Sequence, residues 1–162
     1  MKKSSKGFSL IELLIVVAII LIIAAIAIPN LLRSRIAANQ ASAVGSLRTL
    51  NTAEITYSST YNVGFTSTMT YLAPPTGTGN PNPTSTAAGL IDSVLALVSK
   101  SGYSFVYSAG GPDSTGRINT YSFTAVPIST STGTNYYFTD QSGVIRQNST
   151  TTAQASDSPI AG

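Results

Sequence analysis

Hydrophobic and polar residues divide the chain into one continuous apolar stretch followed by shorter, patterned segments. Residues 8–28, FSLIELLIVVAIILIIAAIAI, are apolar except for Ser9 and Glu12. At about 1.5 Å per residue this stretch makes roughly 31 Å of helix, which matches the hydrocarbon thickness of a bilayer. The pattern therefore predicts a membrane-spanning helix over 8–29.

Residues 30–61 have the pattern of an amphipathic helix. Apolar side chains recur every seven residues, at Ile36, Ala43, Leu50 and Tyr57. Such a stripe is typical of a helix with one buried face. Together with the apolar stretch it predicts one helix of about 50 residues, kinked at Pro29, where a backbone hydrogen bond is lost.

The remaining sequence predicts a small domain over 62–147. A loop rich in Pro, Gly, Ser and Thr precedes a short helix, and alternating aromatic segments then predict three or four antiparallel strands. The expected positions are the loop at 73–89, the helix at 90–100, and the strands at 103–107, 121–126, 136–139 and 144–146. We expect an α+β fold in which the sheet packs on the amphipathic helix, with a flexible tail over 148–162.

Composition excludes several functions. The chain has no Cys and no His, so disulfides, thiol or imidazole catalysis and Cys/His metal sites are excluded. Its few acids form no catalytic constellation, which predicts neither an enzyme nor a cofactor. Two isolated acids, Asp113 and Asp140, are read as turn formers, so no metal site is expected.

Net charge does not indicate a nucleic-acid partner. The formal charge of +3 equals the contribution of Lys2, Lys3 and Lys6, and the other charges balance. A nucleic-acid surface needs a dense basic stripe, which this chain lacks. Instead, the basic leader MKKSSKG, residues 1–7, predicts by the positive-inside rule that the domain after the apolar helix lies outside the cytoplasm.

Glu12 is the one charged residue in the apolar stretch. Placing a charge in hydrocarbon costs several kcal/mol, so such a residue is by default functional or paired. The alternative interpretation is that Glu12 lies at headgroup level and is simply hydrated. Position alone leaves both readings open.

The residues around Glu12 resemble a known motif. GFSLIELLIVVAIILIIAAIAIPN resembles the prepilin N-terminal cleavage and methylation motif of the type IV pilin and type II secretion pseudopilin superfamily. The match combines a basic leader, Gly7, Phe8, a carboxylate four residues after Phe8, and an apolar run that ends at Pro29. Similarity over the rest of the chain is loose.

The resemblance implies specific roles. A prepilin peptidase cuts between Gly7 and Phe8, and the new Phe8 amine is methylated. Glu12 then pairs with the Phe8 ammonium of a neighbouring subunit, and Pro29 lies where family helices kink or melt in filaments. Many type IV pilins close a C-terminal loop with a disulfide, whereas this chain must hold that loop by packing or strand pairing.

The sequence thus predicts a structural filament subunit, most simply a type IV pilin. We expect it in the inner membrane before assembly and in a cell-surface pilus afterwards, with itself, the peptidase and the inner-membrane assembly machinery as partners. One alternative is a pseudopilin of type II secretion. Another is a monomeric, membrane-anchored binding or adhesive domain with an ordinary signal anchor.

Overall fold

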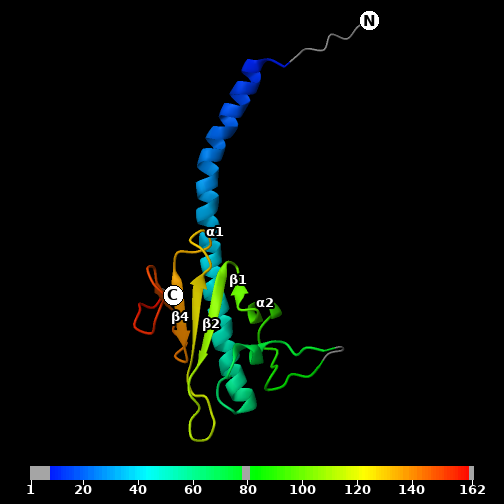
Figure 1. The fold of residues 1–162 in the computed structure, drawn as a ribbon, viewed down its shortest axis with the longest axis vertical. Coiled ribbons are helices and arrows are strands. Elements are labelled where there is room, and N and C mark those ends of the chain that lie inside the picture. The colour runs from blue at the N-terminus through cyan, green and yellow to red at the C-terminus, as the bar shows by residue number, and fades with distance from the viewer. Residues whose placement is uncertain (1–7, 78–80, 161–162) are drawn as a thin grey trace. The chain divides into compact units, whose positions relative to one another are not determined.

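The computed structural model describes residues 8–77 and 81–160 (Figure 1). Its first element is helix α1, Leu10–Tyr61, which continues through Pro29. Two compact units share this helix: the first ends at Arg35 and the second begins at Ile36.

The first unit consists of the apolar half of α1. Its large apolar side chains are exposed, from Phe8 at 78% to Leu32 at 44% of their surface. This part of α1 is long and apolar enough to cross a membrane. The described residues leave these side chains exposed, so they are accessible to lipid or to other protein.

In the second unit, α1 contributes the apolar stripe that the sequence predicts. Ala43, Leu50 and Tyr57 are buried, while Ile36 is half-buried. The polar residue Asn51, next to Leu50 of this stripe, is also buried, at 7% exposure. It is accommodated because its amide donates to the Thr139 hydroxyl at 2.8 Å and accepts from the Tyr121 hydroxyl at 3.1 Å.

A five-stranded antiparallel sheet completes the α+β fold expected from the sequence. The strands follow chain order as a meander, and every neighbouring pair is antiparallel. They are β1 (Ser99–Lys100), β2 (Tyr103–Ala109), β3 (Tyr121–Pro127), β4 (Tyr136–Asp140) and β5 (Arg146–Asn148).

Aromatic side chains of the sheet fill the core. Alternate residues of β2, β3 and β4 point toward α1 and are buried: Tyr103, Phe105, Tyr121, Phe123 and Tyr137. They form one apolar cluster with Leu47 and Leu50 of α1. The alternation of aromatic residues along these strands thus places one face of the sheet in the core.

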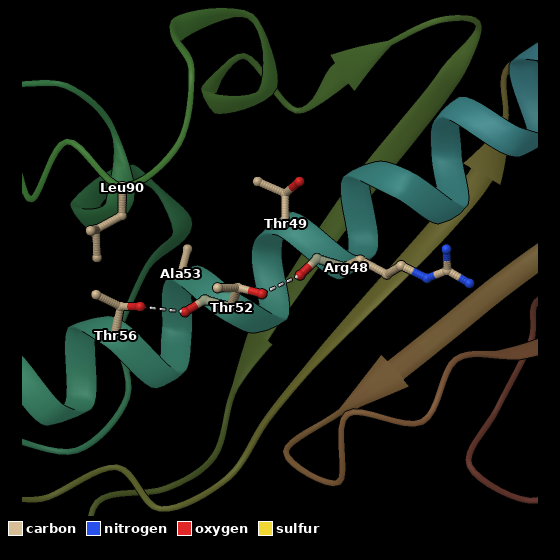
Figure 2. A pocket seen from close by; sticks show the side chains of 6 residues that line it. All are labelled: Arg48, Thr49, Thr52, Ala53, Thr56 and Leu90. Carbon is tan, nitrogen blue, oxygen red and sulfur yellow. Dashed lines mark hydrogen bonds between the residues drawn. The ribbon is translucent and has the colours of Figure 1, made fainter.

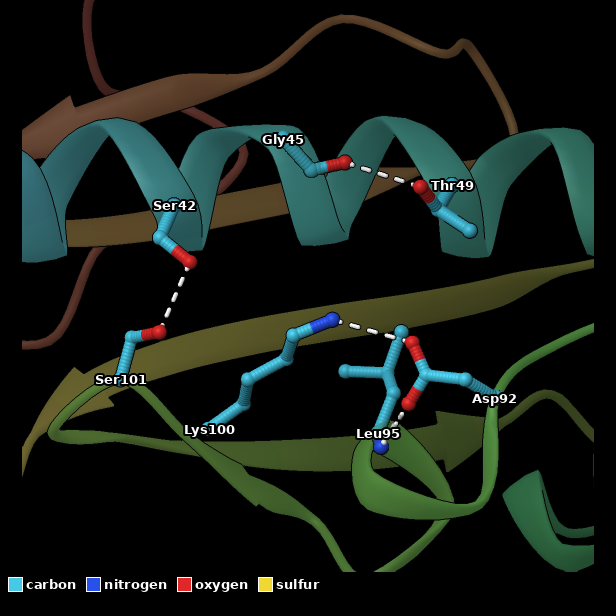
Figure 3. Close-up of polar contacts among 7 residues, drawn as sticks. All are labelled: Ser42, Gly45, Thr49, Asp92, Leu95, Lys100 and Ser101. Carbon is cyan, nitrogen blue, oxygen red and sulfur yellow. Dashed lines mark hydrogen bonds and ion pairs between the residues drawn. The ribbon is translucent and has the colours of Figure 1, made fainter.

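The helix expected over 90–100 is shorter in the structure. Only α2, Ser93–Ala96, is helical, and it follows the 3₁₀ helix η1, Met69–Leu72. Asp92 caps α2 by accepting from the Leu95 N–H at 2.7 Å, and its other oxygen pairs with Lys100 at 3.0 Å (Figure 3). Val98 then takes a φ of +56°, which stops the helix before β1 begins.

The tail expected to be flexible folds back on β5 in the structure. The Ile160 N–H donates to the Ile145 carbonyl at 2.9 Å, and Arg146 and Pro159 form an isolated β-bridge. Asp157 accepts from Asn148 at 3.0 Å and from the Gln154 N–H at 2.7 Å. Polar contacts thus hold a segment whose low apolar content had predicted fraying, since composition does not show how polar groups pair.

Candidate assembly site

The N-terminus of α1 is closed by its own side chains. The Ser9 hydroxyl accepts from the Ile11 N–H at 3.3 Å, and Glu12 Oε2 accepts from the Ser9 N–H at 3.0 Å. Ser9 is thus the N-cap and Glu12 the third helical residue, the arrangement of a capping box. The pattern Ser-x-x-Glu before an apolar run is the sequence signal for this cap.

In this geometry only one oxygen of the Glu12 carboxylate accepts a hydrogen bond from the described residues. Its Oε1 accepts no hydrogen bond from any described residue, while Oε2 is held by the cap. The carboxylate is exposed and lies in the first turn of α1. One oxygen is therefore free to accept a cation without breaking the cap.

The other predicted site residues lie as follows. Phe8 is exposed and precedes the helix, at the same end as Glu12. Pro29 lies inside α1, far along the helix from both. Gly7 falls outside the described residues. Among the described site residues, Phe8 and Glu12 thus lie at the same end of α1, and Pro29 lies apart from them.

A hollow of about 310 Å³ lies on α1 in the second unit, lined by Arg48, Thr49, Thr52, Ala53, Thr56 and Leu90 (Figure 2). Its threonine hydroxyls already donate to carbonyls of their own helix: Thr52 to Arg48 at 3.0 Å and Thr56 to Thr52 at 2.8 Å. Arg48 is the one ionisable side chain in this lining. The hollow therefore presents no acid–base pair for catalysis.

The two turn acids serve the loops in which they lie. Asp113 accepts from the Thr115 hydroxyl at 2.6 Å, the Arg117 N–H at 3.0 Å and the Asn119 amide at 2.8 Å. These hydrogen bonds, Thr115 first, hold the pKa of Asp113 well below its usual range. Asp140 accepts from the Ser142 N–H at 2.9 Å. Both act as the turn formers that the sequence predicts.

One buried carboxylate had no predicted role. Glu54 of α1 is fully buried and accepts from both the N–H and the hydroxyl of Thr66, at 3.0 and 2.6 Å. The Tyr107 hydroxyl donates to the Thr66 carbonyl at 2.6 Å. Burial raises the pKa of Glu54, while the Thr66 hydrogen bonds act in the opposite direction. Glu54 thus fastens the end of α1 to the following loop.

Comparison with known proteins places the similarity in the N-terminal segment. Residues 2–28 match the family model of the prokaryotic N-terminal methylation motif. The type IV wide pilus major component PilA4 of Thermus thermophilus is 65% identical over 37 residues, which are 23% of this chain and 28% of the relative. The type IV major pilin protein PilA of Myxococcus xanthus is 52% identical over 50 residues, 31% of this chain and 23% of the relative.

These matches span about a quarter of each relative's length. No solved structure matches the chain. The α+β arrangement of an apolar N-terminal helix and an antiparallel sheet agrees with the fold expected from the sequence. Residues 2–28 thus carry a prokaryotic N-terminal methylation motif, and part of the chain is similar to type IV pilins.

Proposed function

We propose that this protein is the structural subunit of a type IV pilus, processed at its N-terminus and polymerised through α1. The observation that carries the proposal is an exposed apolar helix with one carboxylate at its start. The relatives that share this segment are described as a major pilin and a major pilus component. Its role is therefore mechanical rather than enzymatic.

Processing creates the assembly site. A prepilin peptidase cleaves between Gly7 and Phe8, and the Phe8 amine is then methylated. Phe8 is exposed and lies before the first helical residue, so a peptidase reaches it without unwinding α1. The N-cap at Ser9 lies after the cleavage point, so the helix start survives the loss of the leader.

Assembly joins two copies through opposite charges. The Phe8 ammonium of one subunit pairs with Glu12 of its neighbour, whose Oε1 accepts no bond from the described residues while Oε2 holds the cap. Two unpaired charges are costly in an apolar filament core, and pairing offsets most of that cost. The pair thus sets the axial register, whereas burial of the apolar side chains stabilises the polymer, at about 25 cal/mol per Å².

Pro29 has a separate role. It removes one helical hydrogen bond near the end of the apolar half of α1 and so weakens the helix there. Before assembly, the subunit lies in the inner membrane, with its second unit outside the cytoplasm. The inner-membrane assembly machinery then transfers it to the growing cell-surface filament.

Intact-mass and N-terminal analysis of sheared surface material tests this function. A chain that begins at methylated Phe8 in a high-molecular-weight surface fraction is the expected result. Processing at Phe8 with the protein confined to the envelope indicates a pseudopilin of type II secretion. A chain that still begins at Met1 refutes assembly and indicates a monomeric, membrane-anchored binding domain.

A further inference from the structure

The long helix carries an uncompensated positive charge. Between Glu12 and Glu54, α1 contains Arg33, Arg35 and Arg48 but no acid. Arg33 and Arg35 are exposed, and neither side chain has a hydrogen bond or ion pair within the described part of the chain. These two guanidinium groups therefore need a partner from outside the chain, or else remain solvated.

Their position coincides with the end of the apolar half of α1. Leu31 and Leu32, at 55% and 44% exposure, are its last large apolar residues, and Arg33 follows directly. The helix from Glu12 to Arg33 is about 31 Å long at 1.5 Å per residue, close to the hydrocarbon thickness of about 30 Å. Glu12 and Arg33 therefore bracket the span, and the arginines lie at the exported surface.

The arrangement around the helix favours one kind of partner. Residues two apart on a helix are separated by about 200°, so Arg33 and Arg35 project from nearly opposite sides. Ser34, between them, is bonded to its own helix through the Asn30 carbonyl at 3.0 Å. A single neighbouring acid reaches one side of α1, whereas lipid headgroups surround it and reach both.

Most acids of a second copy already form ion pairs or accept hydrogen bonds within their own chain. Asp92 pairs with Lys100, Asp113 is held by its own turn, and Asp157 accepts from two partners in the tail. Phosphate, by contrast, is abundant at a membrane surface and fits the bidentate geometry of a guanidinium group. Charge complementarity thus points to the membrane.

We propose that Arg33 and Arg35 form a phosphate-binding collar for anionic lipid headgroups of the exported-side leaflet. This inference rests on the membrane anchorage in the proposed function. The collar fixes the depth at which the unassembled subunit lies in the membrane, with Glu12 at the opposite interface. It must be released when the subunit leaves the lipid for the filament.

The test measures lipid selectivity of the full chain in phosphatidylcholine vesicles. Spin-labelled phosphatidylglycerol or phosphatidylcholine reports which lipid is immobilised against the protein. Lys2, Lys3 and Lys6 are changed to Gln in every sample, so that the leader does not contribute. We expect a preference for phosphatidylglycerol that falls about fivefold for each arginine removed in R33Q and R33Q/R35Q.

R48Q is the matched control. It removes an arginine from the same helix, but one that lies in the second unit and lines the hollow of Figure 2. We expect it to keep the selectivity of the parent chain. An equal loss in R48Q would mean that net charge alone is responsible, and would overturn the collar.

Two further outcomes separate this inference from the proposed function. If R33Q/R35Q keeps the parent selectivity, the collar is refuted, and loss of filaments in that variant would assign the arginines to an acid of a second copy. If the chain is released from vesicles by alkaline carbonate, the anchorage itself is absent. In that case both the collar and the proposed function fail.

Discussion

Glu12 Oε2 accepts a hydrogen bond from the backbone N–H of Ser9 at 3.0 Å, so the residue expected to direct assembly also closes its own helix. The two tasks use different oxygens. Oε2 faces the cap, and Oε1 has no partner among the described residues. A subunit can thus present an acceptor to a neighbour without losing the first turn of α1, and the start of the helix is fixed before any filament forms.

We expect Glu12→Gln to abolish surface filaments while leaving N-terminal processing intact. Gln keeps an oxygen for the Ser9 N–H but carries no charge to pair with an ammonium group. Shear fractionation with N-terminal sequencing measures both effects. Ser9→Ala is the control, because it removes the bond from Ile11 and weakens the cap by about 1 kcal/mol, yet retains the carboxylate.

The two variants separate the role of the Glu12 charge from that of the helix cap. Filaments in Ser9→Ala but not in Glu12→Gln assign assembly to the charge. Equal loss in both variants would instead show that assembly depends on the helix cap, and the ion-pair proposal would then be wrong.

Glu54 makes the stability of the second unit depend on pH. Its pKa is raised above the ordinary value of 4.5, mainly by burial, so the folded state holds its proton more tightly than the unfolded state. The contribution of Glu54 to the free energy of unfolding is therefore complete below pH 4.5 and is lost as pH rises through the raised pKa. Burial also raises the pKa values of its neighbours Tyr57, Tyr107 and Tyr121, which stay neutral over this range.

The comparison of the parent chain with Glu54→Gln isolates this effect. Denaturant unfolding in detergent at several pH values gives the free energy of unfolding for each. We expect the difference between the two proteins to favour the parent most at low pH and to shrink as pH rises. A difference that grows with pH would contradict a raised pKa and show that the Thr66 hydrogen bonds outweigh burial.

The sequence predicted the features that depend on periodicity. The seven-residue repeat of Ala43, Leu50 and Tyr57 identified the buried stripe of α1, and alternation identified β2 and β3. A repeat of this kind records which face of an element is buried, because side chains recur with the geometry of the backbone. The fold class followed from these patterns.

Features that depend on pairing between distant residues were missed. Burial of Asn51 and Glu54 requires partners 88 and 12 residues away, at Thr139 and Thr66. A polar residue on a helix face gives no sign of such a partner, so its position alone suggests solvent. The end of the short helix at Val98 was missed for a related reason, since local propensity does not predict a positive φ.

The Asp157 carboxylate links two parts of the C-terminal loop. It joins Asn148 to the Gln154 N–H and so closes the last loop. We expect Asp157→Ala to weaken that loop by about 1 kcal/mol, which raises amide exchange over 149–160 about fivefold. Thr151→Ala is the control, because the Thr151 side chain makes no hydrogen bond within the described part of the chain. Unchanged exchange in Asp157→Ala would show that the β-bridge at Pro159 suffices.

Substitution of alanine at two glycines should change the free energy of unfolding in opposite directions. A Cβ added at Gly45 meets nothing within 4 Å, and the residue lies inside α1, so Gly45→Ala should stabilise the second unit by about 0.5–1 kcal/mol. Gly64 has a φ of +88°, and a Cβ there would strike the backbone of Ile118, whose carbonyl accepts from the Phe65 N–H at 2.7 Å. Gly64→Ala should therefore destabilise by about 1–3 kcal/mol. Denaturant unfolding measures both. Equal effects of the two variants would mean that Gly64 does not stay packed against the Ile118 backbone in solution.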